Sequence, residues 1–186
     1  LGEDGNIYLL DTRLSEVPVY SPDGERMTTL SREGDGPGET RIPSNLLFMP
    51  DGTLGLVQVF PGKVTKIDLE GNPQGIFQVS GAADGGFMMF FDCQSQNENV
   101  VITGELITTI PPAGQNRHSF VSSYNAEGVE QVKFFEKEFV WDFMKFSLDE
   151  GEFSRPDFRK VAVGKDGRVY INPNRNEYTV LVYNPD

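Results

Sequence analysis

Few chemically reactive side chains occur in this sequence of 186 residues, which has one cysteine, one histidine and one tryptophan. A disulfide within the chain needs two cysteines, so none can form, and Cys93 beside an apolar stretch is expected to be a core residue rather than a nucleophile. His118 cannot supply a histidine-rich zinc site, and it would have to be the base of any Ser-His-Asp triad. No G-x-S-x-G nucleophile elbow accompanies it.

Long apolar runs and an excess of positive charge are also absent. No hydrophobic segment approaches the roughly 20 residues that cross a bilayer, so membrane insertion is not expected. The 16 Lys and Arg are outnumbered by 28 Asp and Glu, which gives a net charge of −12. Nucleic acids and anionic lipids are bound by clustered Lys and Arg, so neither is an expected partner. Solubility is the simplest interpretation of the acidity.

Glycine and proline are plentiful, with 20 and 12 residues, and they divide the chain into short segments. An acidic residue followed by glycine, a pair that closes tight hairpins, occurs at intervals of about 47 to 59 residues in two interleaved series. The pairs are Asp4-Gly5, Asp23-Gly24, Asp51-Gly52, Glu70-Gly71, Glu127-Gly128 and Asp166-Gly167. A repeat of roughly 40 to 60 residues with four strand-like segments is typical of a β-propeller.

The segments between the turns are rich in Val, Ile, Phe and Tyr, which sheets favour. The sequence predicts roughly 14 strands, no long helix and a single domain. The strands are assigned to blade 1 (about 1–33), blade 2 (about 44–80), blade 3 (about 86–136), an insertion (about 137–158) and blade 4 (about 159–186). Aromatic residues in 134–158 occur at both helical and strand spacing, so a short helix and an extended arm both stay open.

Blade 2 carries the most specific motif. The loop Gly34-Asp35-Gly36-Pro37-Gly38-Glu39 precedes Pro43 and the turn Pro50-Asp51-Gly52. Elsewhere a second-strand motif and its Asn-Arg loop recur, in Ile7-Tyr8-Leu9-Leu10-Asp11, Val169-Tyr170-Ile171-Asn172 and Asn174-Arg175. These motifs resemble the NHL repeat, and the chain resembles bacterial six-bladed β-propellers of that type. The fold class implied is all-β: a propeller with four-stranded antiparallel blades, of which about four are present.

The resemblance implies six blades in the intact domain. A propeller hides its strand edges by closing into a ring, so two incomplete terminal blades would leave open edges that seek partners. We therefore expect a fragment of a longer protein, or a second chain that completes the sheet. A ring of four compact blades is the alternative.

Long loops on a rigid scaffold carry function more often than short, uniform turns. If the inner strands run from top to bottom, the acidic-Gly turns lie on the bottom face. Three unusual stretches, 34–41, 105–117 and 136–159, then lie on the top face. The predicted ligand-binding residues of this face are Arg13, Arg41, Asn45, Arg117, Trp141, Phe143, Asn174 and Arg175.

Simpler structural roles compete with several of these assignments. The glycines of 34–41 are expected to serve backbone geometry, because the run is not a G-x-x-x-x-G-K-[ST] loop and no helix follows it. Asp11 and Arg13 are expected to form a structural pair at a blade tip. The aromatic arm is either a lid over a ligand or an apolar cover for neighbouring blades.

Metal sites are a further option that the resemblance raises. Some NHL-like propellers are lyases whose metal is held by several histidines, a set that this chain cannot supply. Others, resembling gluconolactonases, hold a calcium-type ion at the channel with acidic and Asn side chains, and Asn45, Asn172 and Asn174 could face the channel here. No stretch has the spacing of an EF-hand.

The leading hypothesis is a non-catalytic β-propeller scaffold that binds a protein, peptide or glycan through its top-face loops, without a cofactor. The alternative is a metal-dependent hydrolase or lyase, gluconolactonase-like, with its site at the axial channel. The chain begins with neither methionine nor a basic-then-apolar leader, so it is interpreted as an excerpt whose start does not bear on export. Only the family resemblance favours a periplasmic or extracellular bacterial protein.

Overall fold

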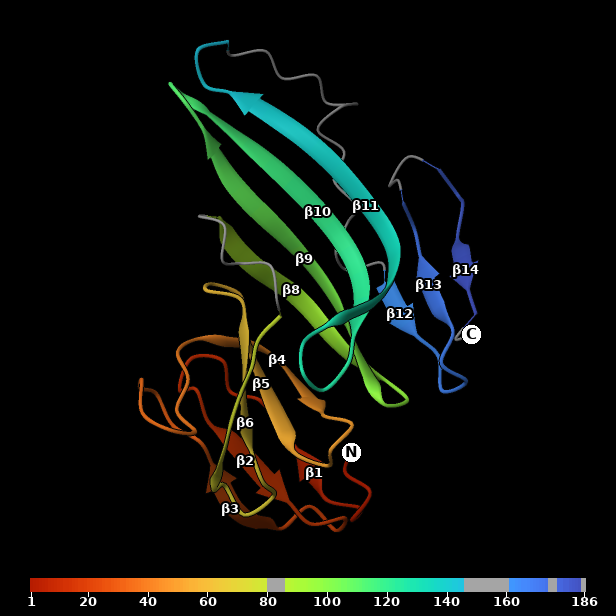
Figure 1. The fold of residues 1–186 in the computed structure, drawn as a ribbon. Coiled ribbons are helices and arrows are strands. Elements are labelled where there is room, and N and C mark those ends of the chain that lie inside the picture. Colours follow the sequence, from red (N-terminus) through yellow and green to blue (C-terminus); the bar gives the residue numbers. More distant parts are fainter. Residues whose placement is uncertain (80–85, 146–160, 174–176, 185–186) are drawn as a thin grey trace.

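The computed structural model describes residues 1–79, 86–145, 161–173 and 177–184. Within these ranges the chain forms strands, turns and loops, and no helix is long and apolar enough to cross a bilayer. The strands make four antiparallel sheets of three or four strands, each built from strands that are consecutive in the sequence (Figure 1). This confirms the all-β, antiparallel part of the expectation.

The sheets are numbered 1 to 4 in chain order. Sheet 1 contains β1 (Ile7–Tyr8), β2 (Val17–Tyr20) and β3 (Arg26–Leu30), and sheet 2 contains β4 (Pro43–Phe48), β5 (Leu54–Gln58), β6 (Lys63–Ile67) and β7 (Pro73–Phe77). Sheet 3 contains β8 (Phe87–Gln96), β9 (Asn99–Ile110), β10 (Gly114–Tyr124) and β11 (Glu130–Asp142), and sheet 4 contains β12 (Val161–Val163), β13 (Val169–Ile171) and β14 (Leu181–Tyr183).

Three apolar clusters join successive sheets face to face. Leu56 of sheet 2 packs with sheet 1, Phe90 of sheet 3 with sheet 2, and Val169 of sheet 4 with sheet 3. The first strands of sheets 2, 3 and 4 are neighbours, with β4 beside β8 and β8 beside β12. Among the described residues no such cluster joins sheet 4 to sheet 1, so these parts form an open arc and not the alternative, a closed ring of four blades.

The acidic-Gly turns are held by their own side chains. Asp51 Oδ1 accepts a hydrogen bond from the backbone N–H of Thr53 at 3.0 Å, and Gly52 adopts a φ of +81°. Asp68 likewise accepts hydrogen bonds from the side chain and the backbone N–H of Asn72, and these donors hold the pKa of the Asp68 carboxyl below its usual value. Such turns fix where each hairpin reverses.

Two glycines with the same backbone conformation provide a matched test of how sheets 2 and 3 approach each other. Gly24 and Gly128 have φ values of +85° and +75°. A methyl group on Gly24 would meet nothing within 4 Å, whereas one on Gly128 would collide with the backbone carbonyl of Gln78. Gly24→Ala is expected to cost about 1–2 kcal/mol for the left-handed backbone. Gly128→Ala should cost about 1–3 kcal/mol more.

Urea denaturation of the two variants measures this difference directly. Equal losses would contradict the close approach of the β10–β11 turn to the end of sheet 2.

Sheet 3 departs most from the sequence-based expectation. Its strands have 10 to 13 residues, against 2 to 6 in the other sheets. Residues 105–110 continue β9 and 114–117 begin β10, so the expected top-face loop over 105–117 is a hairpin with a short turn at Pro111. The expected insertion at 137–158 was also misplaced at its start, because residues 137–142 continue β11. Residues 146–158 lie outside the described ranges.

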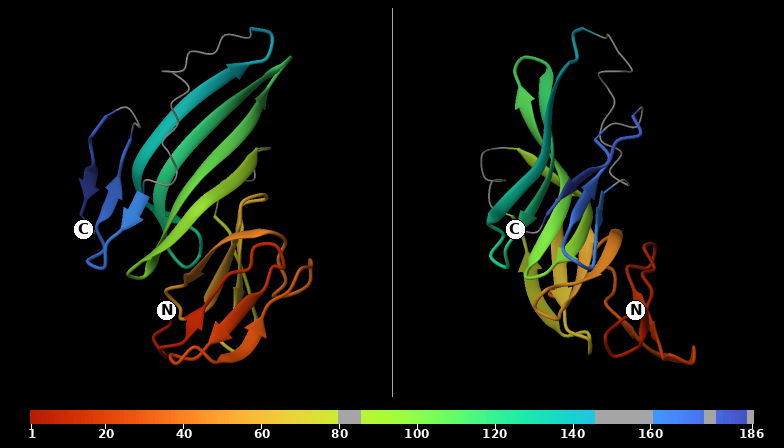
Figure 2. Two further views of the ribbon diagram at one scale, coloured as in Figure 1. Left: turned by 180° about the vertical axis from the view of Figure 1, so that it is seen from behind. Right: turned by 90° about the vertical axis from the view of Figure 1, so that its right-hand side faces the viewer.

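The reason for these differences is the alternation of side chains along the strands. Backbone pairing between β10 and β11 extends to Gly114 opposite Asp142, so aromatic residues of 136–142 follow the two-residue strand period rather than the helical one. Figures 1 and 2 show that sheet 3 reaches well beyond the sheets on either side. We call this projecting part, which comprises residues 105–117 and 137–142, the distal half of sheet 3.

Candidate functional site

One face of the distal half carries a charged and aromatic cluster. Residues opposite each other across β9, β10 and β11 share a face, which brings Glu105, Arg117 and Trp141 together. Glu105 is only 2% exposed, and its carboxylate lies 3.7 Å from Arg117 Nη1. The same carboxylate accepts a hydrogen bond from Ser119 Oγ at 3.3 Å. The guanidinium carbon of Arg117 lies 5.3 Å from the centre of the Trp141 ring, which is cation–π geometry.

These contacts give Arg117 a structural role. A buried carboxylate without a cationic partner is costly, and Arg117 is the residue that neutralises Glu105. The aromatic row continues from Trp141 to Phe143, with ring centres 5.8 Å apart, and Phe143 is exposed. Three of the predicted site residues, Arg117, Trp141 and Phe143, therefore lie together, although the first is already engaged by its neighbours.

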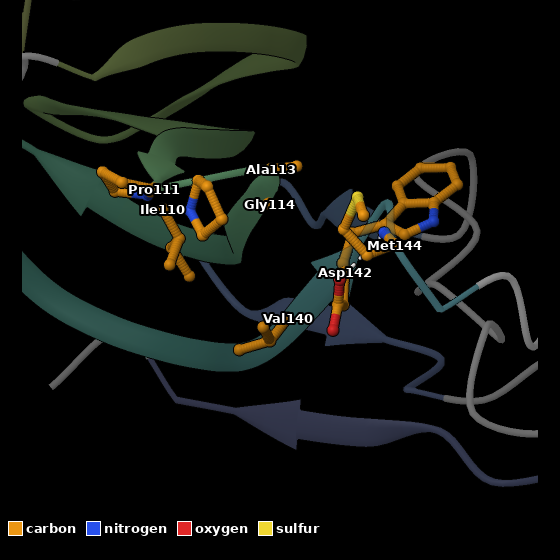
Figure 3. Close-up of a pocket in the computed structure, with 9 residues that line it drawn as sticks. Ile110, Pro111, Ala113, Gly114, Val140, Asp142 and Met144 are labelled. Carbon is orange, nitrogen blue, oxygen red and sulfur yellow. Dashed lines mark hydrogen bonds between the residues drawn. The ribbon is translucent and has the colours of Figure 1, made fainter.

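The tip of the distal half holds a small apolar pocket of about 170 Å³, which we call the tip pocket (Figure 3). Ile110 of β9 and Val140 of β11 point toward it from opposite sides. Gly114 of β10 pairs with Ile110 on one side and Asp142 on the other, and its missing side chain leaves the space between them open. The remaining lining residues are Pro111, Pro112, Ala113, Trp141 and Met144.

The pocket is accessible to a partner because its apolar walls face solvent. Val140 is 61% exposed and Met144 is 77% exposed. Its volume is smaller than the roughly 300–1,000 Å³ typical of pockets for small molecules and cofactors. It is of a size to take a single side chain.

The only histidine of the chain, His118, lies on the same face of sheet 3 as Val140 but farther from the tip. His118 Nδ1 is 3.3 Å from Glu138 Oε1, and Nε2 is 3.5 Å from Glu136 Oε2. Lys133 lies 3.0 Å from Glu136 and holds the pKa of that carboxyl below its usual value. Because the two carboxylates face different ring nitrogens, they do not share one point with the imidazole. No group of three or more His, Cys, Asp or Glu within the described ranges is arranged to hold a metal ion.

A second polar group lies on the inner strands. Asn45 of β4 and Gln94 of β8 each donate a hydrogen bond to Asp92, at 2.6 Å in both cases. Gln94 also bonds the backbone of β12, so this chain of contacts, which we call the axial network, connects sheets 2, 3 and 4. The adjoining Cys93 is buried between sheets 2 and 3, and burial, with the nearby charge of Asp92, raises the pKa of its thiol. A thiol in this state is not a nucleophile.

The remaining predicted residues lie elsewhere. Arg41 is used within the Gly-rich loop, where its Nε and Nη2 contact the Asp35 carboxylate at 2.9 and 2.8 Å and lower the pKa of that group. Arg13 is exposed in the β1–β2 turn, and its backbone N–H, not its guanidinium, donates to Asp11 Oδ1 at 2.9 Å. Asn172 follows β13 and donates to the backbone carbonyl of Glu177.

The eight predicted residues therefore do not form one site. Asn174 and Arg175 lie outside the described ranges. Asn45 belongs to the axial network, and Arg117, Trp141 and Phe143 belong to the distal half of sheet 3. Sequence reasoning missed Gln94 and Glu105, although each is a polar residue placed in a largely apolar strand, which is a usable signal.

Comparisons with known proteins give little further information. No protein-family model matches the sequence, and no curated protein matches it. Among solved structures, one described as "Streptogramin B lyase structure" is similar with a TM-score of 0.45 and 13% identity, covering 91% of this chain and 59% of that one. This chain thus spans less than two thirds of that structure. At this identity and TM-score the match assigns neither a family nor an activity to the chain.

Proposed function

We propose that this chain is part of an NHL-like, six-bladed β-propeller that works as a binding module, and that it binds a protein partner at the tip pocket of sheet 3. Sheets of consecutive antiparallel strands that pack face to face, with their first strands adjacent, are what successive propeller blades require. The observation that carries the binding role is the apolar surface at the tip of the projecting sheet. Clustered exposed apolar side chains rimmed by polar residues mark interaction sites.

The size of the pocket favours a protein partner over a small molecule. A cavity of about 170 Å³ fits one apolar side chain, and interfaces are commonly anchored by one such side chain in a pocket. A glycan would instead stack on an aromatic face such as that of Trp141 and would not depend on Val140.

The negative charge of the chain indicates which residues of the partner would lie beside its apolar anchor. The net charge is −12, and Glu138 and Asp142 lie on the same strand face as Val140. A partner segment with Lys or Arg beside its apolar anchor would be attracted and oriented by this field. The alternative, a metal-dependent hydrolase or lyase at the axial channel, would need a ligand set that the described residues do not bring together.

Selection of peptides from a displayed random library tests the proposal. Peptides selected on the wild-type chain should share an apolar residue next to Lys or Arg, and they should bind less tightly at higher salt. Val140→Asp should weaken them about 100-fold or more, because it places a carboxylate in the apolar contact. Val182→Asp is the matched control, since Val182 is 52% exposed on β14, in another sheet.

Comparison with Val182→Asp also shows which results would contradict binding at the tip pocket. Selected peptides that bind Val140→Asp as well as wild type, or that lose binding equally to Val182→Asp, would overturn the assignment of the tip pocket. Glycan binding that survives Val140→Asp but not Trp141→Ala would replace the protein partner with a carbohydrate.

A further inference from the structure

We propose that the axial network forms a second binding site, which takes an organic cation, an ammonium or guanidinium group, at the Asp92 carboxylate. This inference is independent of the tip pocket. It rests on which hydrogen-bonding positions of three side chains are already used, and on the cavity beside them.

The amide of Asn45 has no hydrogen left to offer. Its Nδ2 donates to Asp92 Oδ1 at 2.6 Å and to the backbone carbonyl of Cys93 at 3.2 Å. Its Oδ1 accepts the backbone N–H of Leu46 at 2.7 Å. An amide NH₂ carries two hydrogens, so both are accounted for.

The amide of Gln94 is used in the same way from the other side. Its Nε2 donates to Asp92 Oδ2 at 2.6 Å and to the backbone carbonyl of Val161 at 3.1 Å. Its Oε1 accepts the backbone N–H of Val163 at 2.9 Å. The side-chain amides of Asn45 and Gln94, whose N–H hydrogens are all engaged in hydrogen bonds, therefore hold Asp92 in place, one at each carboxylate oxygen.

The Asp92 carboxylate can still accept further hydrogen bonds, whereas the two amides have no N–H left to donate. Each oxygen of an ionised carboxylate can accept about two hydrogen bonds, and each oxygen of Asp92 receives one from these amides. A ligand that approaches Asp92 must therefore bring donors. Water and neutral hydroxyl groups meet that requirement, but the charge of the carboxylate selects further.

The charge of Asp92 has no cationic partner among the described residues. The ion pairs of those ranges involve other acids, and no Lys or Arg lies within 4 Å of Asp92. A bound ammonium or guanidinium group would supply both the donors and the missing positive charge, and charge-assisted hydrogen bonds are about twice as strong as neutral ones. The negative charge of the whole chain would also concentrate cations around it.

The cavity beside Asp92 is large enough for the rest of such a ligand. It is a wide depression of about 540 Å³ that is open to solvent, so it would leave much of a bound ligand exposed. Residues 46–48 of β4 and Val163 of β12 line it beside the polar network. This combination suits a cationic head on an apolar stem, as in a free alkyl amine or guanidine or in the side chain of a Lys or Arg residue.

Nuclear magnetic resonance of the side-chain amides tests the site, because the NH₂ groups of Asn45 and Gln94 contact the carboxylate directly. N-acetyl-arginine amide should shift these two signals saturably, whereas N-acetyl-citrulline amide, a neutral analogue of the same shape, should not. Agmatine stands for a free guanidine, and acetyl-Gly-Arg-Gly-amide stands for an Arg side chain of a protein. The one with the lower Kd identifies which of the two kinds of ligand the site prefers.

Two variants with the same change in net charge complete the experiment. Asp92→Asn should raise the Kd of N-acetyl-arginine amide about tenfold or more. Glu98→Gln, which alters an exposed acid of the β8–β9 turn, should leave it unchanged. Equal shifts with arginine and citrulline amides in the wild-type protein, or no saturable shift with either, would overturn the proposal whether or not Asp92→Asn folds.

Discussion

Replacing Arg117 with alanine is expected to lower the free energy of unfolding by about 3–5 kcal/mol, because it leaves the buried carboxylate of Glu105 without a cation. The two groups lie 3.7 Å apart, and Glu105 is 2% exposed, so the carboxylate depends on the guanidinium rather than on bulk water for its stabilisation. The variant also loses the contact of Arg117 with the Trp141 ring. Thermal unfolding should occur about 6–20 °C lower, as measured by calorimetry or circular dichroism.

Two further variants separate the buried charge from other effects of the substitution. Arg41→Ala removes an arginine of the exposed Gly-rich loop and should cost much less. Combining Arg117→Met with Glu105→Leu should restore most of the stability, because an apolar pair replaces a buried ion pair at little cost. A double variant as unstable as Arg117→Ala would show that Glu105 is not the source of the loss.

Phe90→Ala should also destabilise the protein by about 3–5 kcal/mol. Phe90 is fully buried in the cluster between sheets 2 and 3, next to the backbone of Gly62. Its backbone N–H donates to the backbone carbonyl of Val59, in the β5–β6 turn of sheet 2, at 3.1 Å, so the ring sits where the two sheets are joined directly. Chemical denaturation measures the loss.

The matched control for this substitution is Phe143→Ala. Phe143 is exposed, and its ring contact within the described ranges is with Trp141, so its removal should cost about 1 kcal/mol. Comparable losses for the two variants would mean that sheets 2 and 3 do not share a core at Phe90. A loss for Phe90→Ala without a change in the denaturant slope would show that the substitution lowers stability without changing the surface exposed on unfolding.

Much of the fold could be predicted from the turns. Pairs such as Asp51-Gly52 mark where a hairpin reverses, and short apolar runs between them became strands close to the expected places. The length of sheet 3 could not be predicted, because polar residues in 105–117 are typical of a loop. They occur in strands here since the distal half projects past its neighbours, so alternate residues face solvent and need not be apolar.

The candidate sites were predictable only in part. Arg117 and Trp141 were selected because they lie in two unusual stretches, 105–117 and 136–159, that were assigned to the same face, and cross-strand pairing does place them together. Glu105 stands out as a polar residue in a largely apolar strand, but its pairing with Arg117 depends on a register that only three-dimensional pairing defines. Asp92 and Gln94 differ from their apolar surroundings at a two-residue spacing, but their link to Asn45, 47 residues away, is a contact between sheets.

The consecutive order of strands within every sheet has an evolutionary consequence. Because no strand of the described residues inserts between those of another sheet, each sheet is a self-contained module whose interfaces lie with the sheets before and after it. Tandem duplication of such a module lengthens the array without rethreading the chain, and one copy can diverge while the rest maintain solubility. The elongated sheet 3 fits this history, because the strands of one module became longer while those of the other sheets stayed short.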